Sequence, residues 1–172
     1  MTKEELKKYI SRKMKLLGYQ TRKSYYYRII DEDYLIGFCL EPTGRSKGYY
    51  FICGIIYLPD SIKMPINGIF DLEWKFVFPW EPIGEFDIEK CIDNKLYKKV
   101  FEYEAYSLEQ LEELFSVNYA YFIERLSDKE YGLDLFRNNW KRMNRFSVQS
   151  IDKICKRAGL DTAAVLKYLG KG

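Results

Sequence analysis

Three residues in the middle of the chain have types and a spacing that would suit metal-dependent hydrolysis. Pro59-Asp60 is followed, after twelve residues, by Glu73-Trp74-Lys75. If two antiparallel strands hold these segments, Asp60 and Glu73 lie near the same end of the pair, and Glu73 and Lys75 point to one face. Carboxylate oxygens are hard ligands that converge well on a cation such as Mg²⁺. The spacing therefore predicts two carboxylates and an amine near one point.

This pattern resembles the PD…ExK signature of a large and divergent nuclease family. The resemblance implies that Asp60 and Glu73 hold Mg²⁺ and that Lys75 helps to activate or stabilise the attacking water. The alternative is structural, because so short a motif arises by chance in a chain rich in Asp, Glu and Lys. Glu102 and Glu104 are also two apart on an expected strand. They lack a neighbouring His, Lys or Ser motif, so we expect a solvated strand face there. The sequence as a whole indicates no cofactor.

The segment 151–170 has the pattern of a helix-turn-helix. Gly159 stands at the turn, where a positive φ would strain other residues, and Asp161 is placed to cap the second helix. Cys155 supplies a small side chain where two helices would cross closely. The pattern predicts burial of six apolar residues: Ile151, Ile154, Ala158, Leu160, Val165 and Leu169.

Whether this hairpin reads DNA is a separate question. Among the outward positions of its second helix, Lys167 is the only strong polar donor, and Leu166 is apolar and expected to be exposed. Lys153, Lys156 and Arg157 of the first helix would contact phosphates, which gives affinity without sequence readout. These five residues are the candidate binding residues. They disfavour a sequence-specific regulator, and the exposed leucine suits a protein partner better.

The net charge of +3 hides a strong segregation. Residues 1–28 carry nine basic and two acidic groups, residues 137–172 carry nine and two, and residues 29–136 carry ten and twenty-one. Either the basic ends dock onto the acidic middle, or they converge into one basic face that meets nucleic acid or an acidic protein. The first arrangement needs no partner and is the default.

The composition excludes several classes of active site. The chain has no histidine, which excludes His-based acid–base catalysis, Ser-His-Asp and Cys-His nucleophiles, and His-containing metal sites. Its four cysteines, at positions 39, 53, 91 and 155, form no CxxC pair, and three have apolar neighbours, as core cysteines do. No apolar run approaches a membrane span or a signal core. We therefore expect a reduced, cytoplasmic protein with no membrane partner.

Apolar periodicity sets the expected elements. A basic amphipathic helix over residues 3–17 has Leu6, Ile10, Met14 and Leu17 on one side and ends at Gly18, and we expect its basic face to be merely solvated. Strands are expected at 25–30, 34–41, 49–58, 71–78 and 95–106, with antiparallel order because the connections are short. Helices follow at 107–126, 133–143, 147–157 and 162–169. In the first of these, the predicted apolar face includes Leu108, Leu111, Leu114, Phe115 and Leu126.

Together these elements predict a single α+β domain over 1–172. Its N-terminal helix packs on an antiparallel sheet of about five strands (1–106), and C-terminal helices including the helix-turn-helix-like hairpin follow (107–172). The basic helix, LGYQTRKSYYYRI and YYFICGIIYLP resemble an uncharacterised bacterial family of unknown function over roughly residues 1–106. That resemblance implies this fold and no established activity.

The absence of a convincing active site, the sixteen tyrosines and the segregated charge favour a non-enzymatic protein that binds another protein. By analogy with small cytosolic α+β proteins that accompany bacterial toxins, we expect an immunity-type role. The alternatives are nucleic-acid binding through the basic terminal helices and, third, the Mg²⁺-dependent nuclease.

Overall fold

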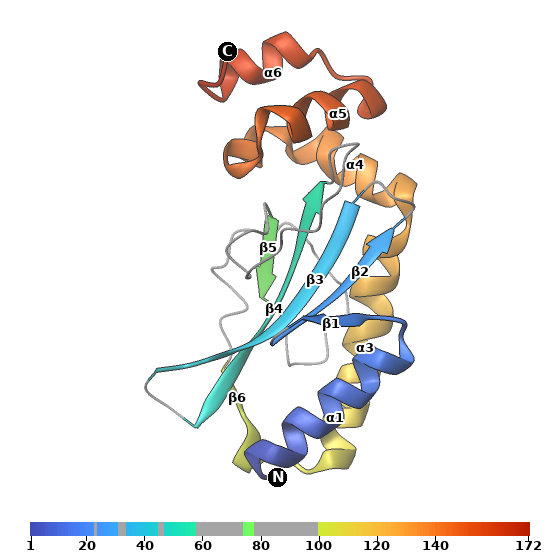
Figure 1. Ribbon diagram of the computed structural model, residues 1–172, viewed down its shortest axis with the longest axis vertical. Coiled ribbons are helices and arrows are strands. Elements are labelled where there is room, and N and C mark those ends of the chain that lie inside the picture. The colour runs from blue at the N-terminus through green and yellow to red at the C-terminus, as the bar shows by residue number, and fades with distance from the viewer. Residues whose placement is uncertain (23, 31–33, 45–46, 58–73, 78–99) are drawn as a thin grey trace.

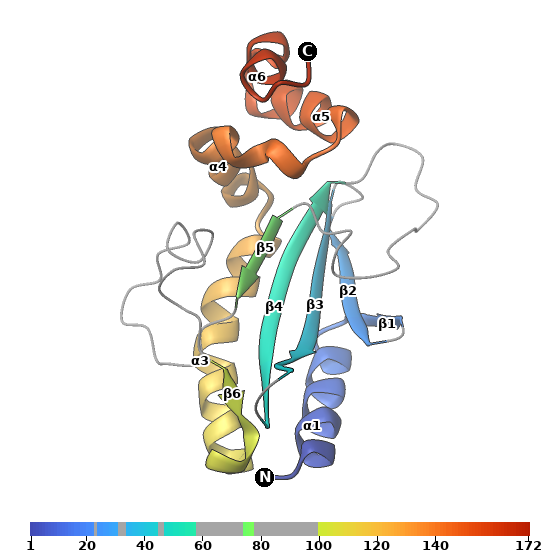
Figure 2. The ribbon, with the colours of Figure 1, turned by 90° about the vertical axis from the view of Figure 1, so that its left-hand side faces the viewer.

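The computed structural model describes residues 1–22, 24–30, 34–44, 47–57, 74–77 and 100–172. An N-terminal helix packs on an antiparallel sheet and several helices follow, which confirms the predicted α+β architecture (Figure 1). The two termini lie at opposite ends of the long axis (Figures 1 and 2). Within the described part of the chain, every helix is too short or too polar to cross a bilayer.

Helix α1 (Lys3–Leu16) begins and ends where local chemistry directs it. Thr2 and Glu5 form a capping box, in which each side chain bonds the other residue's backbone N–H. The chain leaves the helix through Gly18, whose φ of 79° suits a residue without Cβ. The predicted inner face is confirmed, since Leu6, Ile10 and Met14 are fully buried.

The sheet is antiparallel throughout its described strands, as predicted. Its strands follow the order β1 (Gln20–Arg22), β2 (Tyr25–Ile30), β3 (Tyr34–Pro42), β4 (Gly48–Tyr57) and β5 (Trp74–Val77). A sixth strand, β6 (Phe101–Glu102), pairs with the start of β4. The β3–β4 hairpin is the longest pairing among the described strands, with Pro42 opposite Tyr49 at its closed end.

Two parts of the sheet differ from the sequence prediction. Strand β1 was not expected, and it pairs with β2 in a short hairpin in which the Tyr27 hydroxyl donates to Gln20 Oε1 at 2.7 Å. The strand expected over 95–106 is a strand only at β6 among the described residues, and it turns at once into a 3₁₀ helix, η2 (Tyr103–Ala105). The expectation that Glu102 and Glu104 share a strand face is therefore wrong. Glu104 instead pairs with Lys47 at 2.9 Å.

One face of the sheet forms the main core with α1 and α3 (Leu108–Ser127). Phe115 of α3 lies at the centre, with its ring centroid 6.4 Å from Phe38 of β3, 6.5 Å from Phe51 of β4 and 6.0 Å from Tyr9 of α1. Edge-to-face rings at these separations are favourable beyond the area they bury. Leu35, Cys39 and Ile52 point to the opposite face and form a second, smaller buried cluster.

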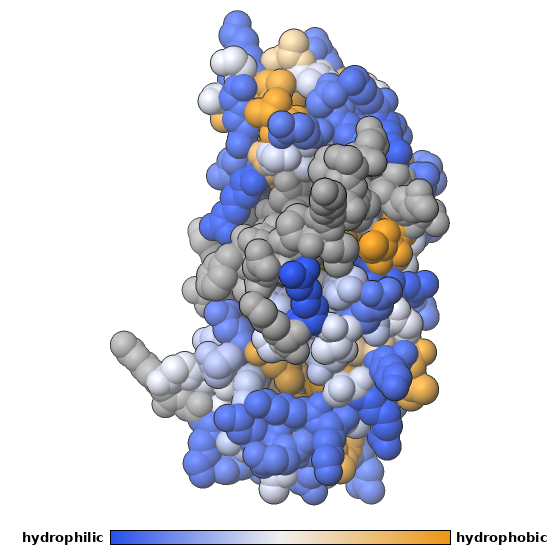
Figure 3. Space-filling view, in the orientation of Figure 1, coloured by the Kyte–Doolittle hydropathy of each residue, from blue (hydrophilic) through white to orange (hydrophobic). Residues whose placement is uncertain are grey.

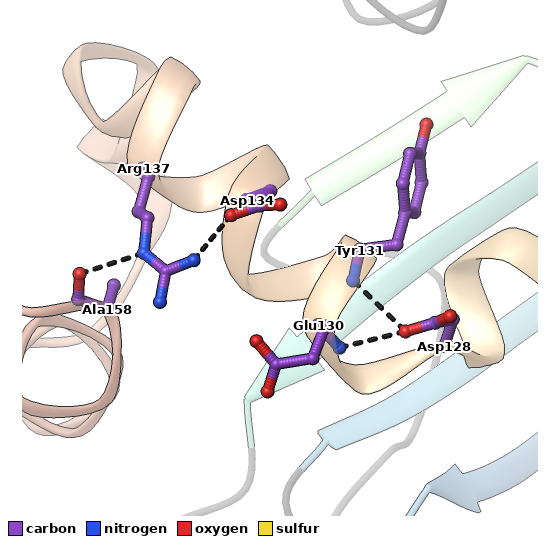
Figure 4. Close-up of polar contacts among 6 residues, drawn as sticks. All are labelled: Asp128, Glu130, Tyr131, Asp134, Arg137 and Ala158. Carbon is purple, nitrogen blue, oxygen red and sulfur yellow. Dashed lines mark hydrogen bonds and ion pairs between the residues drawn. The ribbon is translucent and has the colours of Figure 1, made fainter.

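The C-terminal helices are α4 (Lys129–Asn139), α5 (Val148–Ala158) and α6 (Thr162–Tyr168), with the 3₁₀ helix η3 (Trp140–Arg145) after α4. The helix predicted from residue 133 begins four residues earlier because Asp128 caps it, accepting from the N–H groups of Glu130 and Tyr131 at 2.9 and 3.1 Å (Figure 4). The remainder of the predicted helix is not α-helical, because a 3₁₀ helix follows Asn139.

Tyr34 joins the sheet to these helices. Its hydroxyl donates to the carbonyl of Leu126 near the end of α3, and its ring lies against Gly132 of α4. A Cβ on Gly132 would lie 3.4 Å from that hydroxyl, so glycine permits the close approach. The main cluster of buried residues then continues from the sheet to Val165 of α6.

Candidate functional site

The residues expected to form a nuclease site fall largely outside the described part of the chain. Asp60 and Glu73 lie in the segment 58–73, which is not described. Strand β5 does pair antiparallel with β4, as the nuclease geometry requires, and Lys75 stands opposite Gly54. Within the described residues, no group of three Cys, Asp or Glu side chains could hold a metal ion. The nuclease site stays a prediction.

The helix-turn-helix geometry of α5 and α6 is confirmed. Gly159 has φ 69° and ψ 31°, and Asp161 accepts from the N–H groups of Ala163 and Ala164 at 2.9 and 3.1 Å. Arg137 of α4 donates to the carbonyl of Ala158 at 2.9 Å and so satisfies the end of α5 (Figure 4). The predicted apolar residues are buried or half-buried and packed in the core: Ile151, Ile154, Cys155, Ala158, Leu160, Val165 and Leu169.

The five candidate binding residues of this hairpin do not form one exposed basic surface. Lys156 pairs with Asp152 at 2.7 Å, one turn before it on α5, and Lys153 is half-buried. The expectation of an exposed Leu166 is wrong, because this side chain is half-buried and packs against the core. Arg157 and Lys167 are exposed. The large apolar residue that α6 does expose is Tyr168, at 60%.

Tyr168 belongs to a small aromatic group at this end. Its ring lies 5.0 Å from that of Trp140, edge to face, and the Lys141 ammonium lies 5.7 and 5.8 Å from the two ring centroids. Cation–π contacts at these distances are weakly favourable at an exposed site. This lysine is therefore already engaged within the protein.

A groove of about 600 Å³ lies beside α1 at the other end of the molecule. The helix contributes Lys3, Lys7, Lys8 and Ser11 to its lining. Strands β2 to β4 and their flanking residues contribute the rest: Ser24, Tyr26, Leu40, Pro42 and Tyr49. Figure 3 shows a largely hydrophilic surface at this end. The lining of the groove thus combines apolar side chains from the strands with lysines from α1.

The position of the lysines that line this groove follows from their spacing along α1. Lys3, Lys7 and Ser11 are spaced four apart, so they form one stripe along the helix, next to the buried face of Ile10 and Met14. With the described residues, Lys3, Lys7 and Lys8 form no ion pair. Lys3 also stands in the first helical turn, where the helix dipole disfavours a cation. An anion in the groove would offset both this effect and the repulsion between like charges four residues apart.

A separate network fixes α1 in position. Glu112 of α3 accepts a hydrogen bond from the Tyr9 hydroxyl and forms an ion pair with Lys13. The Ser116 hydroxyl also donates to this carboxylate, at 3.3 Å. Partial burial raises the pKa of Glu112, but the bonds from Lys13 and Tyr9 outweigh this and hold that pKa below its usual value. Burial, with the bond to Glu112, raises the pKa of Tyr9 well above its usual value. The carboxylate therefore stays ionised and holds α1 against α3.

The two arrangements expected from the segregated charge have different outcomes. Docking of a basic end onto the acidic middle occurs at Lys13 and Glu112. Convergence of the two basic ends into one face is wrong, because α1 and α6 lie at opposite ends of the molecule (Figures 1 and 2). The expectation that the basic face of α1 is merely solvated stays a prediction, and the structure adds that Lys3 and Lys7 line a groove. The strand residues that complete the groove come together only in the fold.

Comparisons of the chain with models of protein families, with curated proteins and with solved structures find no match. The resemblance of residues 1–106 to an uncharacterised bacterial family stays a prediction.

Proposed function

We propose that this protein is a non-enzymatic binding protein for an acidic partner protein, which it holds in the groove beside α1. One observation carries the proposal: Lys3, Lys7 and Lys8 make no ion pair with the described residues, and they line a groove of about 600 Å³ together with Leu40 and Pro42. Cations without local partners favour an anionic ligand, and the apolar side chains of the lining favour one that also carries aliphatic surface.

A polypeptide fits this groove better than a nucleic acid does. Proteins that bind single strands offer open aromatic faces for base stacking, often with arginine. Here Tyr49 is 4% exposed and Tyr26 is half-buried, with its ring against Phe38, so neither offers an open face. The cations of this groove are lysines, which act as point charges rather than planar forks. Glutamate or aspartate side chains, with short aliphatic stems, match such a lining.

Nucleic-acid binding through the C-terminal hairpin is the second candidate. It is favoured by the turn geometry of Gly159 and by the exposed Arg157 and Lys167. Ala163 and Ala164, exposed on α6, offer nothing that reads a base edge. The nuclease is the third candidate, and it fails if Glu73→Ala and wild-type protein are equally inert on DNA and RNA with Mg²⁺ or Mn²⁺.

The cellular setting and the immunity-type role belong to the same proposal. Cys53 and Cys155 are buried and free, which suits a reducing, cytoplasmic compartment. An immunity-type role would make the acidic partner a toxin. If the gene directly upstream encodes a toxin, its product is the first partner to test.

Two charge-reversed variants test the proposal, because the two basic ends provide a matched pair. Lys3→Glu/Lys7→Glu alters the groove, and Lys156→Glu/Lys167→Glu alters the hairpin by the same net charge. The probes are fluorescent poly-L-glutamate and short single-stranded and duplex DNA, measured by anisotropy over a range of salt. We expect polyglutamate to bind wild type, the groove variant to lose at least about tenfold in affinity, and the hairpin variant to lose less than about threefold.

Two results would overturn this function. Absence of polyglutamate binding removes the acidic-partner proposal. Tighter binding of duplex DNA, falling steeply with salt and lost in the hairpin variant, replaces it with the nucleic-acid candidate. Far-UV circular dichroism of both variants checks that the fold is retained.

A further inference from the structure

A second groove flanks α1 on the side that faces α3. It has a volume of about 400 Å³ and is lined by Glu5, Lys8, Tyr9, Arg12 and Leu108. Lys8 lines both this groove and the larger one. The exposed ridge of α1 therefore separates two hollows that share a cation.

Leu108 is the unexpected member of this lining. The periodicity of α3 predicts that it is buried with Leu111 and Phe115, yet it is 41% exposed, whereas those two are buried. It is the first residue of α3, after the cap at Ser107, and helical side chains lean toward the N-terminus. Its side chain therefore extends beyond the part of α3 that packs on the sheet. The second groove thus has an apolar wall that the described residues leave partly exposed.

The other polar groups of this groove divide into engaged and available ones. Glu5 bonds the Thr2 N–H at 2.7 Å, and the Tyr9 hydroxyl donates to Glu112, so both are engaged within the protein. Lys8 and Arg12 form no ion pair with the described residues. The available groups are therefore two cations beside one leucine.

We infer that the partner straddles α1, with acidic groups over Lys8 and its neighbours and an apolar side chain against Leu108. This inference rests on the proposed function and narrows its ligand. The preferred occupant is a mixed acidic and apolar segment of a protein, rather than a purely acidic stretch or a small anion, because only an extended chain reaches both hollows across the helix. Apolar burial and charge then act at the same site.

Two peptides of equal length test this inference: one in which single leucines interrupt runs of glutamate, and one with serine in place of each leucine. We expect wild type to bind the leucine peptide about fivefold more tightly, which is the effect of burying part of one leucine side chain. Leu108→Ser removes this preference. Val117→Ser is the matched control, since Val117 is 51% exposed on the same helix, and it retains the preference.

The outcomes separate the inference from the function on which it rests. If Leu108→Ser keeps the fivefold preference, the inference is wrong while the acidic-partner function stands. If neither peptide binds, both fail. A second variant, Leu108→Ala, keeps helix propensity high and guards against a folding defect. Arg12→Glu is expected to weaken both peptides at least about threefold, and an unchanged affinity would also contradict the inference.

Discussion

Both ends of the chain form basic amphipathic helices, α1 at one end and α5 with α6 at the other (Figures 1 and 2). At the C-terminal end, Lys156 pairs with Asp152, Lys141 lies over two aromatic rings, and Leu166 is packed inward. At the N-terminal end, Lys3 and Lys7 stand beside a groove and pair with no described side chain.

The difference teaches that an excess of charge along a segment does not identify a binding surface. Both ends carry the same balance of nine basic and two acidic groups. On α1, lysines that pair with no described side chain line a groove, whereas Lys156 and Lys141 at the other end are engaged within the protein. We therefore expect changes at the C-terminal end to act mainly on stability and changes on the exposed face of α1 to act mainly on binding.

The largest expected effect on stability is at the C-terminal hairpin. Ile154 is fully buried in α5, so Ile154→Ala is expected to lower the free energy of unfolding by about 2–5 kcal/mol. Leu16→Ala is the control in α1, where the side chain is 76% exposed, and it is expected to change stability by less than about 0.5 kcal/mol. Urea unfolding measures both. If folded Ile154→Ala protein binds polyglutamate as weakly as Lys3→Glu/Lys7→Glu, the two ends are coupled and the contrast fails.

A smaller effect is expected where the two ends resemble each other. Gly159 and Gly18 both have positive φ, 69° and 79°. A Cβ added at either position would have no neighbouring atom within 4 Å. Alanine at either position is expected to cost about 1–2 kcal/mol, because the left-handed conformation disfavours a side chain. Gly44 has equal space but no positive φ, so Gly44→Ala is expected to be neutral or slightly stabilising. Thermal unfolding compares the three, and equal costs at all three would contradict this account.

The smallest expected effect concerns the ion pair that holds α1. Glu112 has a pKa below its unfolded value, so its contribution is present at neutral pH and is lost as pH falls through the folded pKa. Because the carboxylate is partly exposed, we expect a contribution below about 1 kcal/mol. Glu112→Gln should therefore be slightly less stable at pH 7 and converge with wild type in acid.

The matched control for this ion pair is Asp152→Asn, which removes the exposed pair with Lys156 at the other end. It is expected to cost only a few tenths of a kcal/mol at pH 7. Chemical unfolding across the acid range measures both variants. A larger effect for Asp152→Asn would reverse the comparison between the ends.

Local patterns predicted much of the fold because local physics decides it. The stripe of Leu6, Ile10 and Met14 predicted α1, and Gly159 with Asp161 predicted the turn and cap of the hairpin. One wrong boundary has a local cause. The start of α4 followed from Asp128, a cap that the sequence did display.

The sequence by itself determined the α+β class, the antiparallel order and the inner faces of the helices, since periodicity and capping act over a few residues. Only the tertiary structure decided which charges face a groove. Lys3 and Lys7 line one groove with Tyr26 and Tyr49 because α1 packs on the sheet, and Leu108 stays 41% exposed at the start of α3. No local rule relates such residues, because the energy that brings them together comes from burial of the shared core.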